Sequence, residues 1–309
     1  MEGKKTTPIA LKAAVIGLGS MGMGMAQSIA RGGIPVSGFD VNPASLSALT
    51  QHGGLPSTSA KEAAAESDIL ATVVVNAAQT RAVLFGKDGV APAIKRGGVI
   101  ISCATMAPGD AKELATEAEK LGLLYLDAPM SGGATKAAAG QLTFMASGTP
   151  EAFERAKPVL DLIAGKVYNL GDAAGAGASF KMVNQLLAGV HIAAACEAMT
   201  FAARLGLDLD KVYEVIAASA GNSWMFENRV PHILDGDYSP RSAVSIFTKD
   251  LGIVSDMARQ EKFPLQIAST ALQMFLMTAA AGMASDDDAS VARMIAQITG
   301  LQLPTAKAN

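Results

Sequence analysis

A glycine-rich turn near the N-terminus constrains the fold more than any other feature of the sequence. In AVIGLGSMG (residues 14–22), a short apolar run leads into Gly17, Gly19 and Gly22, spaced G-x-G-x-x-G, and a helical pattern follows. In this spacing the first glycine permits a tight turn, the second lets a pyrophosphate approach the backbone, and the third lets helix and strand pack closely. The N-terminus of the helix offers free N–H groups to the phosphates. The stretch therefore predicts a strand, a phosphate-binding turn and a helix.

The end of the next predicted strand supports a dinucleotide site. PVSGFD (35–40) ends at Asp40, where an acidic side chain accepts hydrogen bonds from both ribose hydroxyls of an adenosine. The same carboxylate would repel a 2′-phosphate, so the expected cofactor is NAD rather than NADP. A turn whose glycines serve packing alone remains the alternative for the motif by itself. The predicted cofactor contacts from this region are Gly17, Leu18, Gly19, Ser20, Met21, Gly22 and Asp40.

Strand and helix patterns alternate through the first half of the chain. Pro108 and Asp110 are typical of a helix start and Gly122 of a helix end. Alternation of this kind indicates βαβ units and a parallel sheet with helices on both faces. The predicted strands cover residues 13–18, 35–40, 68–75, 98–104 and 123–129, with further strands at 141–148 and 166–171.

The pattern changes after GDAAGAG (171–177). Beyond it lie Ala/Leu/Met-rich helical stretches, which we expect to be broken at Gly206, Pro231, Pro240 and Pro264. The sequence therefore predicts an α/β fold in two domains. A Rossmann-type, doubly wound sheet domain spans 10–174, and an all-α domain spans 175–309. The apolar faces of the later helices exceed the internal needs of one such domain, which favours a subunit interface.

Composition gives no support to several classes of function. The net charge is −3, which gives no reason to expect a nucleic-acid or membrane partner. The two cysteines, Cys103 and Cys196, lie far apart in apolar surroundings, as in a reducing compartment. The N-terminus lacks the apolar core and cleavage pattern of a secretory signal. We therefore expect a cytoplasmic protein.

No spacing of ligand-type residues indicates a zinc site, and we predict no metal. The acidic run SDDDAS (285–290) is interpreted as a loop and helix cap, with a metal role as the alternative. His52 and His232 are expected in loops, and His191 on an apolar helix as a core residue. None of the three histidines is a strong candidate for proton transfer.

One apolar helix gathers polar groups on a single face. In GASFKMVNQLLAG (177–189), Lys181, Asn184 and Gln185 are spaced i, i+3 and i+4, so the three side chains converge. The helix alone leaves two interpretations open, a solvated edge or a site, because long lysine side chains often reach to water. A lysine whose surroundings disfavour its charged form is suited to general acid/base catalysis.

Four segments together resemble the β-hydroxyacid dehydrogenase family, which includes 3-hydroxyisobutyrate dehydrogenase. VIGLGSMGMGMAQSI resembles its N-terminal signature, and DAPMSGGATKAAAGQLTFMASG (127–148) its substrate-binding segment. GAGASFKMVNQ (175–185) is similar to its catalytic motif, and FTKDLGI (247–253) to its cofactor-contacting lysine motif. The segments occur in the family's order and extend over nearly the whole chain.

The resemblance implies a role for individual residues. Lys181 would be the catalytic acid/base and Asn184 a substrate-orienting amide, with Gln185 beside it. The carboxylate of a small hydroxy-acid substrate would be held by Ser131, Gly132 and Gly133. The remaining cofactor contacts would come from Val74 and Val75 through their backbone, from Thr105 near the nicotinamide, and from Lys249. The family also implies a homodimer or homotetramer assembled through the helical domain.

Two departures from the family pattern are visible. After the fourth predicted strand the family carries D-x-S-T, whereas this chain has Ser102-Cys103-Ala104-Thr105, so only the threonine is kept. After the third strand, Val74-Val75 replaces Leu-Pro. The expected activity is NAD-dependent oxidation of a small hydroxy acid. Tartronate semialdehyde or glyoxylate reduction and 3-hydroxyisobutyrate oxidation are alternatives on the same scaffold, and a non-catalytic dinucleotide sensor is an alternative of another class.

Overall fold

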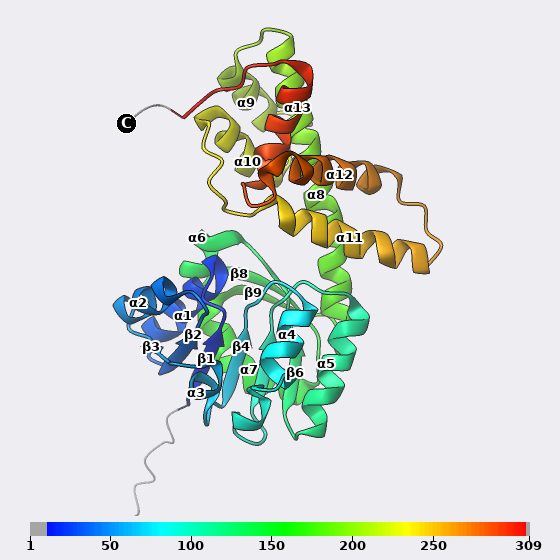
Figure 1. Cartoon of the computed structure of the whole chain (residues 1–309). Helices are drawn as coiled ribbons and strands as arrows, with labels where there is room; N and C mark the ends of the chain where they lie inside the picture. The colour runs from blue at the N-terminus through cyan, green and yellow to red at the C-terminus, as the bar shows by residue number, and fades with distance from the viewer. Residues whose placement is uncertain (1–10, 307–309) are drawn as a thin grey trace, which may run out of the picture. The chain divides into compact units, whose positions relative to one another are not determined.

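The computed structural model describes residues 11–306, which form two compact units divided between Lys181 and Met182 (Figure 1). The helix α8 (Ala176–Arg204) runs without a break from the first unit into the second. The predicted domain boundary at 174/175 lies at the start of this helix, whereas the division between the units lies inside it.

The first unit contains the strands and helices of an α/β domain. Its strands are β1 (Ala13–Ile16), β2 (Val36–Phe39), β3 (Leu55–Pro56), β4 (Ile69–Thr72), β5 (Val99–Ser102), β6 (Leu124–Asp127), β7 (Met130–Ser131), β8 (Leu142–Ala146) and β9 (Ala164–Asn169). Its helices are α1 (Ser20–Arg31), α2 (Pro43–Gln51), α3 (Ala60–Ala64), α4 (Ala77–Phe85), η1 (Ala91–Ala93), α5 (Pro108–Lys120), α6 (Gly133–Ala138) and α7 (Pro150–Ile163).

The main sheet has the order β3-β2-β1-β4-β5-β6, and every neighbouring pair is parallel. Alternate residues of each strand enter different cores. Ala13 and Val15 pack with α1 and α7, while Ala14 and Ile16 pack with α3 and α5. Burial on both faces explains why these strands are continuous apolar runs. The predicted Rossmann-type fold is confirmed.

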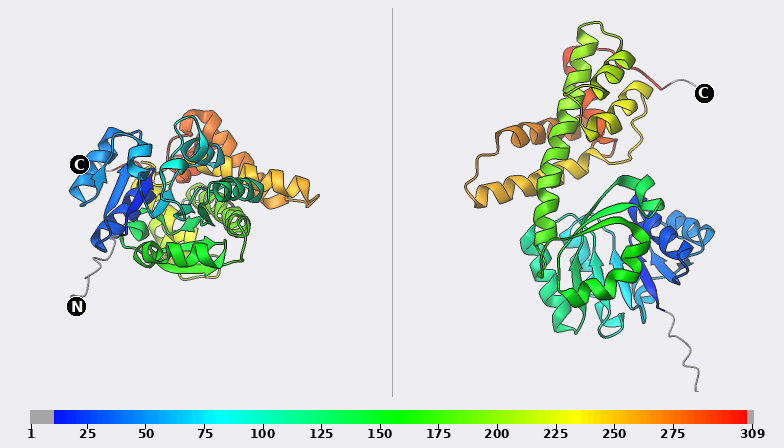
Figure 2. Two further views of the ribbon diagram at one scale, coloured as in Figure 1. Left: turned by 90° about the horizontal axis from the view of Figure 1, so that it is seen from below. Right: turned by 180° about the vertical axis from the view of Figure 1, so that it is seen from behind.

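A second, smaller sheet has the order β7-β8-β9. β7 and β8 are antiparallel, and β8 and β9 are parallel. The strands of this smaller sheet are drawn in green in the right-hand view of Figure 2. Leu142 and Phe144 of β8 belong to the same core as α1 and α7. β3 and β7 were not predicted, because strands of two residues carry no recognisable alternation.

The described residues of the second unit form helices joined by loops and contain no strand, as predicted, apart from one isolated bridge between Ala243 and Asp287. Its core joins α8 to the other helices through Ile192, Val230, Leu251 and Phe275. The helices are the remainder of α8, α9 (Leu209–Ala217), α10 (Trp224–Asp235), α11 (Val244–Gln260), α12 (Gln266–Thr278), η2 (Ala279–Met283), η3 (Asp288–Ser290) and α13 (Val291–Thr299).

The predicted helix break at Pro231 is wrong, because this proline lies inside α10. His232, which we expected in a loop, is therefore on that helix and is 1% exposed. Its Nδ1 lies 2.8 Å from Asp287 Oδ1, and its Nε2 lies 2.7 Å from Arg241 Nη1. A guanidinium can only donate, so Nε2 accepts and Nδ1–H donates to Asp287.

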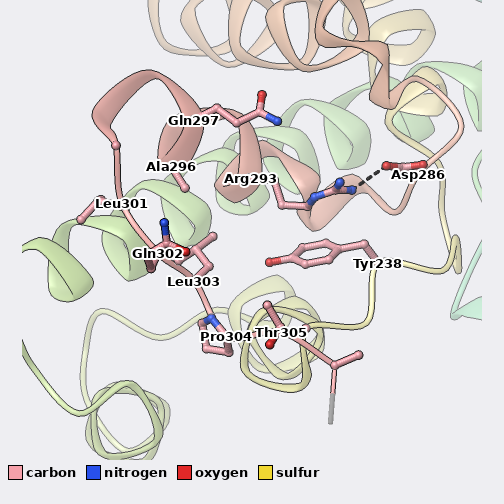
Figure 3. Close-up of a pocket in the computed structure, with 13 residues that line it drawn as sticks. Tyr238, Asp286, Arg293, Ala296, Gln297, Leu301, Gln302, Leu303, Pro304 and Thr305 are labelled. Atoms are coloured by element: carbon pink, nitrogen blue, oxygen red, sulfur yellow. Dashed lines mark hydrogen bonds and ion pairs between the residues drawn. The ribbon is translucent and has the colours of Figure 1, made fainter. Parts of the chain in front are cut away.

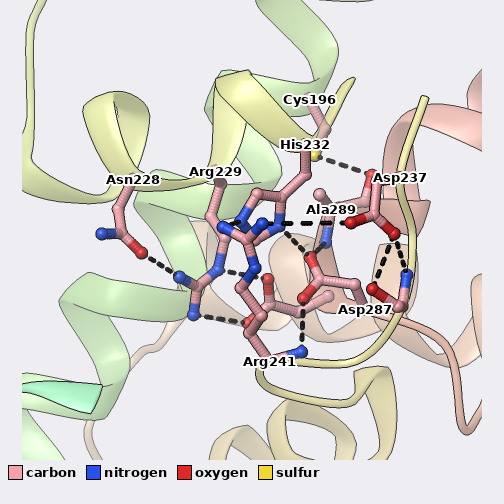
Figure 4. A network of polar contacts seen from close by, with 10 residues as sticks. Cys196, Asn228, Arg229, His232, Asp237, Arg241, Asp287 and Ala289 are labelled. Atoms are coloured by element: carbon pink, nitrogen blue, oxygen red, sulfur yellow. Dashed lines mark hydrogen bonds and ion pairs between the residues drawn. The ribbon is translucent and has the colours of Figure 1, made fainter. Parts of the chain in front are cut away.

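The acidic run 285–290 forms part of this buried polar network (Figure 4). Asp287 also accepts from the backbone N–H of Arg241 and caps η3 through the N–H of Ala289. Arg229 donates to both oxygens of Asp288, at 2.5 and 3.1 Å. The predicted loop and helix cap is confirmed, and the run also ties α10 to the segment before α11. Among residues 11–306, no group of three or more His, Cys, Asp or Glu side chains is arranged to hold a metal ion.

α8 is long and apolar enough, by length and composition, to cross a membrane, but half of its most apolar stretch is buried inside the structure. Ile192, Cys196 and Met199 on this helix are fully buried in the core of the helical unit. Packing within the fold therefore explains the apolar character of this buried face of α8.

Candidate active site

The glycine turn follows β1 directly, and its glycines serve different purposes. Gly17 has φ +95°, and a Cβ there would lie 2.3 Å from the carbonyl oxygen of Val73. A Cβ on Gly22 would lie 1.8 Å from the carbonyl oxygen of Gly17. A Cβ on Gly19 would have no atom within 4 Å. Backbone packing therefore demands the first and third glycines, while the second borders open space.

The first turn of α1 fits a pyrophosphate. Gly19 occupies the N-cap position, no side chain caps the helix, and no acidic residue lies in its first turn. Ser20 is exposed and Met21 half-buried. The N–H groups at this end remain available to an anion, which the helix dipole also favours.

Asp40 follows β2 and lies beside the turn. Its Oδ2 accepts from the backbone N–H of Leu18 at 2.6 Å, and its Oδ1 accepts from that of Asn42 at 2.8 Å. Each carboxylate oxygen has a further lone pair, so ribose hydroxyls can also bind. The side chain of Leu18 is buried, and its N–H is used by Asp40. The residues present thus fit a dinucleotide.

Two further predicted cofactor segments follow the ends of β4 and β5. Val74 is half-buried and Val75 is 46% exposed, and the N–H of Val75 donates to Gln79 Oε1 at 2.9 Å. Thr105 is half-buried, and Cys103, two residues before it, is buried. Carboxyl ends of parallel strands form the edge at which ligands bind in open α/β sheets, and β1 and β2 end there too.

Lys181 is buried, with 7% of its surface exposed, and its Nζ donates to the carbonyl of Met130 at 2.8 Å. Met130 directly precedes Ser131, Gly132 and Gly133, which we predicted to hold a carboxylate. Gly132 has φ +141° and Gly133 has φ +78°, values that favour glycine. The structure therefore brings the predicted acid/base and the predicted carboxylate loop together in the first unit.

In the second unit, three of the predicted residues join a chain of two hydrogen bonds and one ion pair. Asn184 Nδ2 donates to Gln185 Oε1 at 2.9 Å, and Gln185 Nε2 donates to Asp250 Oδ2 at 2.6 Å. Lys249 Nζ lies 2.5 Å from the other oxygen of Asp250. Gln185 is 7% exposed and Asp250 1%. The polar face of α8 is thus mostly buried and hydrogen-bonded, which does not fit a solvated edge.

Sequence reasoning missed two buried carboxylates, Asp127 and Asp250. Asp127 ends β6, is 2% exposed, and accepts hydrogen bonds from the first turn of α8. Asp250 links Gln185 to Lys249. Both residues stand inside the segments that carry the family resemblance, so a search of those segments for acidic residues would have found them.

A separate cavity of about 750 Å³ lies in the helical unit (Figure 3). Tyr238 and Arg293 face each other across 5.1 Å, and Arg293 pairs with Asp286 at 2.6 Å. The segment 300–306 forms another wall. None of the predicted site residues lines this cavity.

The parallel sheet and its phosphate-binding turn define a dinucleotide-binding α/β protein, and the buried lysine beside a glycine loop is suited to acid/base chemistry. Residues 12–171 match the model of the NAD-binding domain of 6-phosphogluconate dehydrogenase, and residues 175–295 match "NAD-binding of NADP-dependent 3-hydroxyisobutyrate dehydrogenase". The chain belongs to the β-hydroxyacid dehydrogenase family, and it is an NAD(P)-dependent hydroxy-acid dehydrogenase.

Full-length relatives support this assignment. An L-threonate dehydrogenase of Cupriavidus necator is 53% identical over 94% of this chain and 97% of its own length. An L-threonate dehydrogenase of Escherichia coli K12 is 50% identical over 95% of this chain and 96% of its own. A crystal structure named 3-hydroxyisobutyrate dehydrogenase, from Salmonella typhimurium, is 51% identical with a TM-score of 0.89, covering 92% of this chain and 99% of that one.

Proposed function

We propose that the protein oxidises L-threonate at C2 to 2-oxo-tetronate, with NAD as the hydride acceptor. Five relatives at 48–53% identity carry the name L-threonate dehydrogenase. The segments ISCATMAP (101–108) and GNSWMFENRVPHILDGDYSPRSAVSIFTKDLGIV (221–254) also resemble that enzyme. The chemistry is carried by one observation, the hydrogen bond from buried Lys181 to the carbonyl of Met130, next to the Ser131 loop.

The proposed roles follow from the chemistry of each group. Lys181 Nζ takes the proton of the C2 hydroxyl during oxidation and returns it during reduction. The Ser131 hydroxyl and the N–H groups of Gly132 and Gly133 bind the substrate carboxylate. Asn184, held by Gln185, orients the substrate. The bound nicotinamide supplies the hydride acceptor.

The remaining parts of the proposal concern the cofactor and the assembly. Thr105, the backbone of Val74 and Val75, and Lys249 contact the cofactor, and Asp40 selects NAD over NADP. We further propose that the protein is cytoplasmic, acts on no nucleic acid or membrane, and is a homodimer or homotetramer assembled through its helical unit.

A second candidate substrate is 3-hydroxyisobutyrate. The Salmonella structure, 51% identical to this chain, bears the name of that dehydrogenase. L-threonate carries hydroxyl groups that 3-hydroxyisobutyrate lacks. A pocket that hydrogen-bonds those hydroxyls discriminates strongly against a compound without them. Tartronate semialdehyde or glyoxylate reduction would use the same residues. A sensor without catalysis would need only the dinucleotide half.

The first experiment measures NADH formation with a panel of L-threonate, 3-hydroxyisobutyrate and D-glycerate, and NADH consumption with tartronate semialdehyde and glyoxylate. We expect the highest kcat/KM for L-threonate. A higher value for another compound would keep the family and change the substrate, and no turnover with any of them, despite NAD binding, would favour the sensor.

A substitution then tests the acid/base. Lys181→Met preserves length and helix propensity and should lower kcat by about 10²-fold or more, the lower bound for general acid/base catalysis. Lys120→Met, at an exposed lysine that ends α5, is the matched control. Both variants should bind NAD as the wild type does. Near wild-type turnover of Lys181→Met would remove Lys181 from the mechanism.

A further inference from the structure

We propose that Asp127 is a positioning residue: its buried carboxylate fixes the first turn of α8 and thereby places Lys181 Nζ against the Ser131 loop. The inference rests on the proposed function, because it takes Lys181 as the acid/base. It assigns no contact between Asp127 and the substrate.

The contacts of this carboxylate converge on one helix end. Asp127 Oδ2 accepts from the N–H groups of Gly175 and Ala178, both at 2.9 Å. Ser147 Oγ donates to the same oxygen at 3.3 Å and accepts from the N–H of Gly177 at 2.9 Å. Three backbone donors at the start of α8 are therefore held by two side chains of the sheet region.

This arrangement differs from the caps of the other helices. α3, α4 and α7 are capped by their own N-cap residues, Ser59, Asn76 and Thr149. Asp127 instead precedes Gly175 by 48 residues and lies at the end of β6. A local cap stabilises a helix wherever the helix lies, whereas a cap from β6 fixes the helix relative to the sheet.

The position of Lys181 follows from this anchor. Ala178 and Lys181 are three residues apart, so about one helical turn separates the anchored N–H from the lysine. Lys181 Nζ donates to Met130, three residues after Asp127. One short segment, 127–130, thus holds both the helix that carries Lys181 and the amine itself. A misplacement of about 1 Å can lower a rate by 10²-fold.

The Ser131 loop has separate support. Ser131 pairs with Thr143 in the β7–β8 ladder, and the backbone groups of Asp127 pair with those of Ser147. Removing the carboxylate leaves these backbone bonds in place. The loss of Asp127 should therefore affect kcat more than the KM for the hydroxy acid.

The shifted pKa of Asp127 agrees with a carboxyl group that is kept for its hydrogen bonds. Burial raises the pKa of Asp127 above its ordinary value, although the hydrogen bonds from Ala178, Gly175 and Ser147 act in the opposite direction. The fold keeps an ionisable group where burial penalises its charge, as is common at functional sites.

The test compares Asp127→Ala, Asp127→Asn and Ser147→Ala with the wild type, using turnover of L-threonate, thermal unfolding and NAD affinity. Asp127→Ala should lower kcat by about 10²-fold with little change in KM and with NAD binding retained. Asp127→Asn should recover most of kcat, because the amide oxygen can accept both N–H groups. Ser147→Ala is the milder variant and should show an intermediate loss of kcat. It carries the test if Asp127→Ala does not fold.

Thr149→Ala, which removes the cap of α7, is the matched control for lost stability. It should lower the unfolding temperature without changing kcat. Wild-type kcat in Asp127→Ala, or the same loss of kcat in Thr149→Ala, would overturn the inference about Asp127. If Lys181→Met is inactive in the same experiment, the proposed function still stands. An active Lys181→Met would overturn both.

Discussion

Asp40 shows how one side chain can shape a turn and select a ligand. It ties the glycine turn to the end of β2 through the N–H of Leu18, and it presents a negative charge where the adenosine ribose is proposed to bind. A 2′-phosphate at that position would meet the carboxylate, so the residue disfavours NADP by repulsion as well as favouring NAD by hydrogen bonding.

We predict that Asp40→Ser lowers kcat/KM for NAD by about tenfold or more, since hydrogen bonds to a charged group are each worth about 1.5–3 kcal/mol. The ratio of NAD to NADP efficiency should fall. Asn42→Ala, which removes the cap of the neighbouring α2, should leave that ratio unchanged. Equal use of NAD and NADP by the wild type would contradict the assignment.

The buried carboxyl of Asp127 predicts a pH dependence of stability. Because burial raises its pKa in the folded state, the folded protein binds this proton more tightly than the unfolded chain does. The resulting stabilisation is fully present below the unfolded pKa of about 3.9 and is lost as pH rises through the folded value. Asp127→Asn cannot titrate at this position.

The free energy of unfolding of the wild type, relative to Asp127→Asn, should therefore increase as pH falls from neutral toward 4. Urea unfolding of both proteins across that range measures it. Asp161→Asn, at an exposed carboxylate that pairs with Lys157, is the control and should show no comparable trend. A difference that stayed constant with pH would show that Asp127 titrates alike in both states.

At the scale of elements, the glycines in the turn between β1 and α1 have different roles: some are required by backbone packing, and another is proposed to make room for the cofactor. The Cβ of Gly22→Ala would meet the carbonyl oxygen of Gly17, whereas that of Gly19→Ala would enter open space. We predict that Gly22→Ala lowers the unfolding temperature, while Gly19→Ala folds normally and binds NAD more weakly. Thermal unfolding and NAD titration of both variants check this pair. Normal NAD affinity in Gly19→Ala would place the pyrophosphate elsewhere.

The elements also show what could be predicted from sequence. The strands of the main sheet other than β3 were predicted, each a residue or more too long at one or both ends, because full burial makes them continuous apolar runs. β3 and β7 are set by pairing with β2 and β8 rather than by their own two residues. Pro231 was misjudged because a proline's lost N–H bond and clash can be accommodated when the surrounding core fixes the helix.

For the site, spacing placed Lys181, Asn184 and Gln185 on one helix face, and the resemblance supplied the Ser131 loop. The hydrogen bond from Lys181 to Met130 spans 51 residues, and the bond from Gln185 to Asp250 spans 65. Long-range pairs of this kind leave no local pattern. The roles given to these residues stay predictions until the variants are measured.

At the scale of the whole molecule, large apolar side chains remain exposed on the helical unit. Phe201 on α8 is 62% exposed and Ile267 on α12 is 72% exposed. Exposed apolar side chains of this size are available to a subunit interface, which agrees with the proposed homo-oligomer. We predict that Phe201→Glu or Ile267→Glu lowers the mass measured by light scattering.

The control for this prediction is Leu55→Glu, at a residue of β3 in the first unit that is 58% exposed. It should leave the mass unchanged, and all three variants should retain their helical circular dichroism. A wild-type protein that is monomeric at every concentration would contradict the proposed assembly.

The anchoring of α8 by Asp127 also bears on recombination between relatives. The carboxylate binds main-chain N–H groups, so it can accept a helix of almost any sequence. The two exceptions are residue 177, where a Cβ would lie 2.3 Å from the carbonyl oxygen of Met145, and residue 175, where φ is +106°. A chimaera that joins this sheet domain to a foreign helical domain should therefore cross over before Gly175, and the foreign parent must carry glycine at both positions. A crossover at the division between Lys181 and Met182 would instead combine a lysine from one parent with amides from the other.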